Sequence, residues 1–304
     1  MSKINQLIQD INEFIQKSSD SSISDVTADY PGIEFLDEQV EQFEKKVAKL
    51  LRNQRKYFIE ALAAFVSKDE DTETLGAFLS FVQQNLFAED EFAQEFGEEA
   101  AAFLSTTIKD LTGLMMDSID KDVQFEVLSQ RTVTWIEEWS EDLGELMQLN
   151  SHNAVEKILS EAIQNGDSIA DIELKLKDLP EFDRARARRT AITEVLTASS
   201  RSQWESYMQS PAVIGKRWKH SGSKGINPRQ NHMELDGTVV GVDELFVIPG
   251  SGETCQYPRD ISLTARERVN CHCALGPVTD ESILGLTKEE KEEIRQQVLL
   301  ELNA

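Results

Sequence analysis

The sequence predicts a mostly α-helical α+β protein: an N-terminal helical bundle, then a small glycine-rich α+β domain, then a terminal helix. Through the first half of the 304 residues, apolar side chains repeat at the three- and four-residue spacing of amphipathic helices. Beyond Pro211 this periodicity stops, and glycine and proline become frequent. We therefore expect the bundle over residues 1–150, the α+β domain with its leading helices over 151–278, and the terminal helix over 279–304.

Apolar stripes place the individual helices of the bundle. They predict helices over residues 4–15, 36–65, 75–86, 92–115 and 125–146. Aromatic side chains recur along these stripes, and at helical spacing they are far more often core residues than cofactor contacts. The first 150 residues therefore indicate a packed scaffold.

Further helices are expected over residues 154–163, 169–176 and 182–208. The last of them carries the one dense basic cluster of the sequence, which consists of Arg184, Arg186, Arg188 and Arg189. One interpretation is a solvated helix face with local pairing to acidic neighbours. The other is contact with phosphate groups or an acidic partner, because guanidinium groups offer a planar, bidentate fork.

Short strands and capped helices are predicted in the C-terminal third. Residues 238–242 and 245–248 have the β-branched and aromatic composition of strands. Thr264 with Glu267, and Thr287 with Glu290, have the spacing of capping boxes. We therefore expect a short helix before Asn270 and a terminal helix after Thr287.

Charge and composition exclude several classes of protein. The net charge is −24, and residues 1–180 hold 15 basic against 37 acidic residues, so a generic DNA-coating role is disfavoured for that part. No apolar run approaches the roughly 20 residues that span a bilayer. The N-terminus lacks the apolar region of a secretory signal, and three cysteines do not form a disulfide framework, so we expect a cytoplasmic origin.

All three cysteines and three of the four histidines fall between Arg217 and Cys273. A structural Zn²⁺ site is one interpretation, with ligands drawn from His232, Cys271, Cys273, His220, Cys255 and His272. In a second interpretation the cysteines are small buried hydrophobes and His232 is a hydrogen-bonded core histidine. A third is a metal-dependent hydrolase or nuclease that uses His232, His220, Asp236 and Asp243. Against catalysis, the sequence contains no complete triad, phosphate-binding loop or His-Glu-x-x-His motif.

Six motifs follow one another in this part of the chain. They are Arg188-Arg-Thr-Ala-Ile-Thr-Glu194, Lys216-Arg-Trp218-Lys-His220, Arg229-Gln-Asn-His232-Met-Glu-Leu-Asp-Gly237, Asp243-Glu-Leu-Phe246, Tyr257-Pro258 and Asn270-Cys-His-Cys273. Together they resemble the Mu F-like phage head morphogenesis family, the minor head proteins of tailed phages, over roughly residues 150–278. The signature positions are Trp218, Arg229, Gly237, Phe246, Tyr257, Pro258 and Asn270. The family's closing motif is Asn-Cys-Arg-Cys, whereas this chain has His272 at the central position.

Because the catalytic motifs are absent, we expect no enzymatic activity. The resemblance implies a minor capsid protein that acts in head assembly together with the portal protein. It also implies the scaffold and major capsid proteins as further partners, and a role in genome packaging or ejection. The expected location is the virion, in the head interior at the portal vertex, after synthesis in the host cytoplasm and without a membrane step. Direct contact with genomic DNA through the basic cluster is an additional hypothesis.

Overall fold

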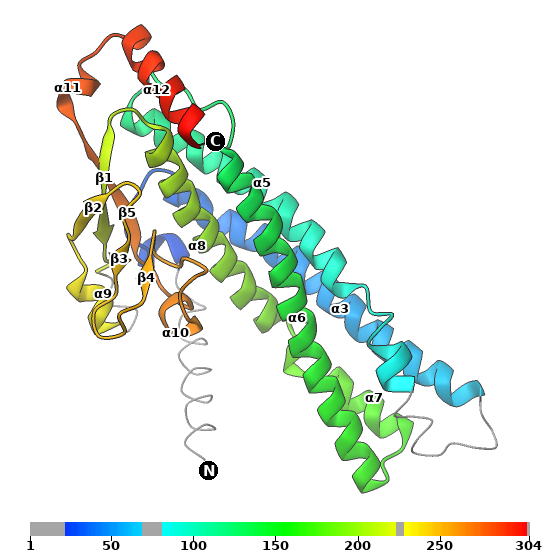
Figure 1. The fold of residues 1–304 in the computed structure, drawn as a ribbon. Helices are drawn as coiled ribbons and strands as arrows, with labels where there is room; N and C mark the ends of the chain where they lie inside the picture. Colours follow the sequence, from blue (N-terminus) through cyan, green and yellow to red (C-terminus); the bar gives the residue numbers. More distant parts are fainter. Residues whose placement is uncertain (1–21, 69–80, 223–227, 303–304) are drawn as a thin grey trace. The chain divides into compact units, whose positions relative to one another are not determined.

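The computed structural model describes residues 22–68, 81–222 and 228–302. Most of the described chain is helical, with a small antiparallel sheet region near the C-terminus and a final helix, as the sequence predicts (Figure 1). The helix expected over residues 4–15 lies outside the described residues. So does most of the helix expected over 75–86, of which Val82–Leu86 forms a single π-helical turn, η2.

The chain divides into two compact units, each built from several segments. Unit 1 comprises residues 1–40, 104–135 and 192–304, and unit 2 comprises residues 41–103 and 136–191. Four long helices contribute residues to both units: α3 (Leu36–Lys68), α5 (Phe92–Ile119), α6 (Gln130–Asn165) and α8 (Arg184–Gln209). Each unit therefore draws on sequence from both sides of residue 150.

Unit 2 is a helical bundle completed by α7 (Ile169–Lys177) and the 3₁₀ turn η3 (Pro180–Phe182). Its aromatic side chains lie in the core, as the stripes predict: Phe43 stacks on Phe103 with ring centroids 4.3 Å apart, and Phe58 is fully buried. Helices α5 and α6 touch through their backbones at Gly144, where an added Cβ would lie 2.3 Å from the Ala93 carbonyl oxygen.

The helices predicted over 125–146 and 154–163 are a single continuous helix, α6, which begins only at Gln130. The start of α6 is fixed by Glu205 of helix α8. The Glu205 carboxylate accepts hydrogen bonds from the Ser129 amide at 2.6 Å and the Thr132 hydroxyl at 2.5 Å. Because these acceptors satisfy donors at the beginning of the helix, they cap α6 from a distant part of the sequence.

Unit 1 contains the strands. Strands β1 (Val213–Lys219), β2 (Val239–Gly241) and β5 (Ala274–Thr279) form an antiparallel sheet in the order β2-β1-β5. Strands β3 (Phe246–Val247) and β4 (Thr254–Cys255) form a separate antiparallel pair. The two predicted strands thus correspond to β2 and β3. Short helices complete the unit: α2 (Ile23–Val26), η1 (Ile33–Phe35), α9 (Gln230–Glu234), α10 (Ala265–Arg268), α11 (Glu281–Leu284) and α12 (Lys288–Leu302).

The C-terminal half of α8 holds the sheet region in place (Figure 1). The Trp204 indole N–H donates to the Val242 carbonyl at 3.0 Å, and the Tyr207 hydroxyl donates to the Leu275 carbonyl at 3.3 Å. Between these elements lies a hydrophobic core that includes Trp218, Phe246, Tyr257 and all three cysteines. The family-like aromatic positions are therefore packing residues of this core.

Candidate metal centre

Three residues place potential metal ligands together in unit 1. His232 lies on α9, and Cys271 and Cys273 lie in the segment that leads into β5. Their ligand atoms all fall within 4.8 Å of one another. His232 Nδ1 is 3.5 Å from Cys271 Sγ and 3.8 Å from Cys273 Sγ, and all three residues are buried.

These distances fit a zinc ion. Zinc–sulfur bonds of about 2.3 Å and zinc–nitrogen bonds of about 2.0 Å place tetrahedral sulfur and nitrogen ligands about 3.5 Å apart. The two observed separations, 3.5 and 3.8 Å, lie close to that value. One imidazole and two thiols are also the donor types that zinc prefers. The group can therefore bind a metal in its present arrangement.

The His232 ring is oriented by hydrogen bonds on its far side. Its Nε2 lies 2.9 Å from Glu267 Oε2, and the Asn231 side-chain amide donates to both Glu267 oxygens at 3.1 and 3.2 Å. Because a carboxylate accepts hydrogen bonds, the Nε2 atom carries a proton, and Nδ1 faces the two thiols. A carboxylate behind a ligating histidine is the usual support of a zinc ligand.

A hydrogen bond links the two thiols. The hydrogen bond from Cys273 holds the pKa of the Cys271 thiol well below its usual range, with a further contribution from His232, although burial acts in the opposite direction. The same hydrogen bond, together with burial, raises the pKa of Cys273. Cys271 is thus the residue that is readily available as a thiolate, the form in which cysteine binds metals.

Arg259 fixes the backbone that carries both cysteines. Its Nη1 donates to the carbonyl oxygens of Cys271 at 2.6 Å and Cys273 at 2.7 Å, and its Nε donates to the Leu196 carbonyl on α8 at 2.9 Å. The side chain is buried, and the residue has a positive φ of 69°. Residue type and spacing do not single out Arg259; its position directly after the Tyr257-Pro258 motif is the signal that the sequence offers.

Glu267 was also missed in this role, because it was assigned to a capping box with Thr264. The short helix α10 is present, but the Thr264 side chain makes no capping hydrogen bond and the Glu267 carboxylate turns to Asn231 and His232. The capping-box prediction at Thr264 is therefore wrong. The other prediction is confirmed: Thr287 and Glu290 cap α12 reciprocally.

The other candidate ligands do not join the group. The His220 Nδ1 accepts a hydrogen bond from the Gly222 amide at 3.0 Å. The His272 Nδ1 faces the Thr27 hydroxyl at 3.4 Å, and burial lowers the pKa of His272 to about 4. Cys255 is fully buried on β4, where burial raises the pKa of its thiol. Within the described residues, His220, Cys255 and His272 are therefore outside the cluster that could hold a metal.

The carboxylates of the hydrolase hypothesis are likewise held elsewhere. Asp236 accepts a hydrogen bond from the His220 backbone amide at 2.8 Å. Asp243 pairs with Arg131 at 3.1 Å, and its side chain is exposed. Neither belongs to the group formed by His232 and the two thiols.

The remaining signature positions shape the backbone around the cluster. Gly237 has a φ of 79°, and its amide donates to the Trp218 carbonyl at 2.9 Å. Asn270 has a φ of 57° directly before Cys271, a left-handed conformation that asparagine tolerates better than most residues. Arg229 donates to the Val269 carbonyl at 2.5 Å, and Pro258 is buried beside Arg259.

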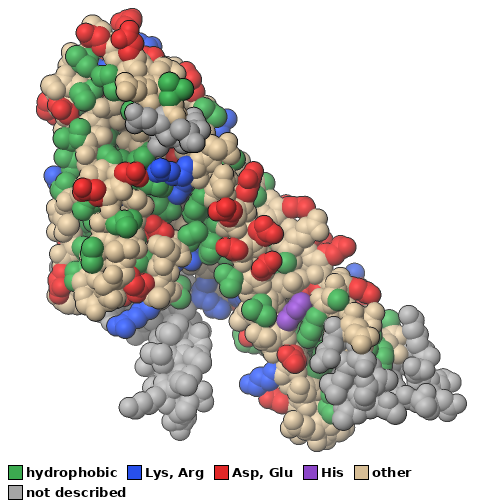
Figure 2. Space-filling model, in the orientation of Figure 1, with side chains coloured by type: hydrophobic (Ala, Val, Ile, Leu, Met, Phe, Trp, Pro, Cys, Tyr) green, Lys and Arg blue, Asp and Glu red, His purple; other side chains and the backbone are tan. Residues whose placement is uncertain are grey.

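The basic cluster on α8 is engaged within unit 2. Arg184 and Arg188 both pair with Glu44, at 2.5 and 3.1 Å. Arg186 is buried and donates to the Ser151 hydroxyl at 2.9 Å and to the Met147 and Glu181 carbonyls. Arg186 therefore lacks the exposure that a DNA contact requires. On the face drawn in Figure 2, Lys and Arg side chains form small separate groups among many acidic ones.

The sequence of the chain is similar to one protein family and to two individual proteins. Residues 153–276 match the model of the phage Mu protein F-like family. The chain is 56% identical to the uncharacterized protein YqbB of Bacillus subtilis (strain 168) over 302 residues, which cover 98% of this chain and 99% of that protein. It is 33% identical over 118 residues to the NAD(+)--arginine ADP-ribosyltransferase EFV of Enterococcus faecalis (strain ATCC 700802 / V583), covering 38% of this chain and 23% of that enzyme.

No solved structure matches the chain. Within the described ranges, no helix combines the length and the apolar character needed to cross a membrane.

Proposed function

Because the chain belongs to the phage Mu protein F-like family, we propose that it is a minor capsid protein of a tailed bacteriophage that acts in head assembly with the portal protein. The observation that carries this proposal is the family match over residues 153–276. The proposal includes the scaffold and major capsid proteins as further partners and a location at the portal vertex of the head. A part in genome packaging or ejection belongs to the same proposal.

The burial of the His232 cluster supports a structural role over hydrolysis. A catalytic zinc keeps one coordination position open to water and substrate. Here the three candidate ligands are each at most 3% exposed, and Glu267 behind them is 1% exposed. We therefore propose that the protein is not an enzyme. The similarity to the ADP-ribosyltransferase covers 23% of that protein, so its named activity is not carried over.

We further propose that His232, Cys271 and Cys273 bind Zn²⁺ and that the ion stabilises the folded sheet region. A structural zinc contributes its binding free energy to folding because the ligands are not assembled in the unfolded chain. Glu267 and Arg259 then act as positioning residues, the first for the imidazole ring and the second for the cysteine backbone. The metal would cross-link two segments, α9 and the stretch that leads into β5, and would supply no chemistry on a substrate.

The head-assembly proposal is tested by isolating tagged portal protein from cells that are assembling heads and analysing the bound proteins by mass spectrometry. Mature particles are analysed in the same way. We expect the chain in both samples, in far fewer copies than the major capsid protein. Its absence from both would refute the proposal.

Two variants sharpen that experiment. Trp218→Ala removes a fully buried side chain from the sheet-region core, so we expect it to be lost from particles. Val247→Ala, at an exposed position of β3, is the matched control and should be incorporated like the wild type.

A further inference from the structure

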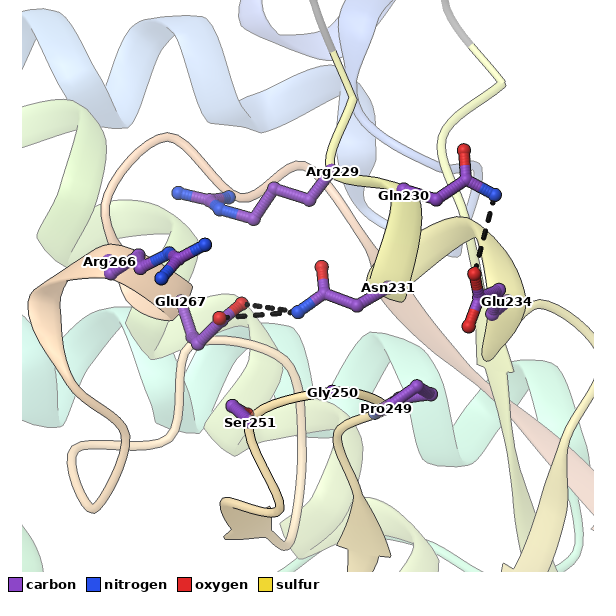
Figure 3. A pocket seen from close by; sticks show the side chains of 9 residues that line it. All are labelled: Arg229, Gln230, Asn231, Glu234, Pro249, Gly250, Ser251, Arg266 and Glu267. Carbon is purple, nitrogen blue, oxygen red and sulfur yellow. Dashed lines mark hydrogen bonds between the residues drawn. The ribbon is translucent and has the colours of Figure 1, made fainter.

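A polar pocket of about 500 Å³ is lined in part by Glu267, the carboxylate that contacts His232 of the candidate metal centre (Figure 3). Its walls come from three segments of unit 1: the beginning of α9 with Arg229–Asn231 and Glu234, the turn Pro249–Ser251, and Arg266 with Glu267 on α10. The volume lies in the range of ordinary ligand sites. Because Pro249 is the one apolar side chain of this lining, the pocket favours a polar ligand.

The two arginines supply hydrogen-bond donors that the protein does not use. Arg229 is held by its Nη2 donation to the Val269 carbonyl, and its other N–H groups have no partner within the described chain. Arg266 is exposed and makes no hydrogen bond or ion pair with the described residues. Figure 3 shows both guanidinium groups on the same side of the pocket. Two positive charges brought together in this way favour an anionic ligand.

The acidic residues of the pocket are already engaged. Both Glu267 oxygens accept hydrogen bonds from Asn231, and one also contacts His232. Glu234 accepts from Gln230 at 3.4 Å. The lining thus carries two positive and two negative formal charges, and its free groups are mainly donors. A planar monoanion fits this balance better than a doubly charged phosphate.

We propose that this pocket binds a carboxylate group of an acidic segment in a partner protein, through Arg229 and Arg266. The planar fork of a guanidinium matches a carboxylate with two parallel hydrogen bonds. Nucleic acid is the poorer candidate, since it carries a charge at every phosphate and the pocket offers only two arginines. The inference relies on the proposed function only in taking the ligand to be a protein segment.

Binding is tested by titrating the full-length protein in a calorimeter with a short capped peptide that contains Glu and Asp. The same peptide with Gln and Asn, inorganic phosphate, and a short single-stranded oligonucleotide are the comparison ligands. We expect saturable binding of the acidic peptide and at least about tenfold weaker binding of the other three.

Three variants assign the site. Arg266→Gln should weaken peptide binding at least about tenfold, because it removes a charged donor without disturbing a contact of the fold. Glu234→Gln should strengthen binding several-fold, since it removes a repelling charge. Arg52→Gln, which removes an exposed arginine of α3, is the matched control and should bind like the wild type.

Equal affinity of Arg266→Gln and wild type would overturn the proposal, and so would tighter binding of phosphate or oligonucleotide than of the acidic peptide. Circular dichroism and zinc content of each variant show whether the fold is intact. Peptide binding by a chain that is absent from phage heads would refute the assembly proposal and leave the pocket assignment standing. A chain that is present in phage heads but does not bind the acidic peptide would refute only the proposal that the pocket binds a carboxylate.

Discussion

Glu267 Oε2 lies 2.9 Å from His232 Nε2, and the side chains of this pair are only 2% and 3% exposed. The contact fixes the imidazole so that its other nitrogen faces Cys271 and Cys273. It also joins two short helices, α9 and α10, that are distant in sequence. A histidine held in this way loses little freedom when it binds a metal, so the carboxylate contributes to affinity without touching the ion.

Glu267→Gln should therefore lower zinc affinity by about tenfold or more, because it removes the negative charge that supports the imidazole. Competition with a chromophoric chelator measures this change. Glu234→Gln, an exposed carboxylate of α9, is the control and should leave zinc affinity unchanged. Identical affinities for Glu267→Gln and wild type would contradict the supporting role of the Glu267 carboxylate.

Removing zinc should destabilise the protein. A ligand present at 100 times its dissociation constant stabilises the folded state by about 2.7 kcal/mol, so a strong chelator should lower the melting temperature by several degrees. The double variant Cys271→Ser, Cys273→Ser should lose this sensitivity to chelator. Cys255→Ala should keep it, since Cys255 lies outside the ligand group. A chelator effect that persists in the double variant would contradict the assignment.

Lys216 makes stability depend on pH in the alkaline range. Burial lowers the pKa of its ammonium group from 10.5 to about 8, although four groups around it favour the charged form: Asp243, Cys255, Asp260 and Glu244. The unfolded chain therefore binds more protons than the folded chain between about pH 8 and pH 10.5. It follows that the contribution of Lys216 to the free energy of unfolding is lowest below pH 8 and rises with pH through this window.

The test is the difference in free energy of unfolding between wild type and Lys216→Met, measured by denaturant titration across that range. We expect the free energy of unfolding of the wild type to increase relative to that of Lys216→Met as the pH rises above 8, because only the wild type carries the titrating ammonium group. Lys45→Met, at an exposed position of α3, is the matched control. If the difference in free energy of unfolding between wild type and Lys216→Met stays constant from pH 7 to pH 10, burial does not lower the pKa of the Lys216 ammonium group.

Periodicity and composition predicted the helical bundle and the small sheet region because each depends on local patterns. They also placed His232, Cys271 and Cys273 among six candidate metal ligands, since histidine and cysteine are rare in the chain. What they did not predict depends on tertiary contacts. Glu267 has the spacing of a capping residue, but its carboxylate is captured by Asn231 and His232 from another helix. Arg259 has no periodicity that marks it, because its partners are three backbone carbonyl groups and the Ser200 hydroxyl, all distant in the sequence.

Arg186 should be a stability residue of unit 2. Burial lowers the pKa of its guanidinium to about 10, and three acceptors on neighbouring elements hold it. Arg186→Ala should cost about 3 kcal/mol, because it leaves buried oxygens without their donor. Arg184→Ala should have little effect, since Arg184 is exposed and Arg188 still pairs with Glu44. Denaturant titration compares the two, and equal stabilities would contradict the buried position of Arg186.

The DNA-contact hypothesis for the same cluster is checked separately. A gel shift at low salt with the double variant Arg188→Ala, Arg189→Ala would reveal any contribution of these side chains to binding. Because Glu44 already neutralises part of this cluster, we expect the wild type and the double variant to show no difference.

Two glycines of the long helices should respond in opposite directions to the same substitution. Alanine is the better helix former by about 1 kcal/mol, so Gly→Ala is stabilising wherever space allows. At Gly113 of α5 the nearest atom to an added Cβ is Phe125 Cδ1 at 3.8 Å, an ordinary contact. At Gly144 the added Cβ would lie 2.3 Å from the Ala93 carbonyl oxygen and 3.3 Å from the Gly97 amide nitrogen. These neighbours are backbone atoms of α5, so α5 and α6 would have to move apart.

We therefore expect Gly113→Ala to raise the free energy of unfolding by up to about 1 kcal/mol. Gly144→Ala should lower it by about 1–3 kcal/mol, because overpacking outweighs the gain in helix propensity. Denaturant titration of both variants under one condition provides the comparison, and circular dichroism confirms that each remains helical. If Gly144→Ala proves as stable as Gly113→Ala, the backbones of α5 and α6 are not in contact at Ala93. The close packing of unit 2 depends on that contact.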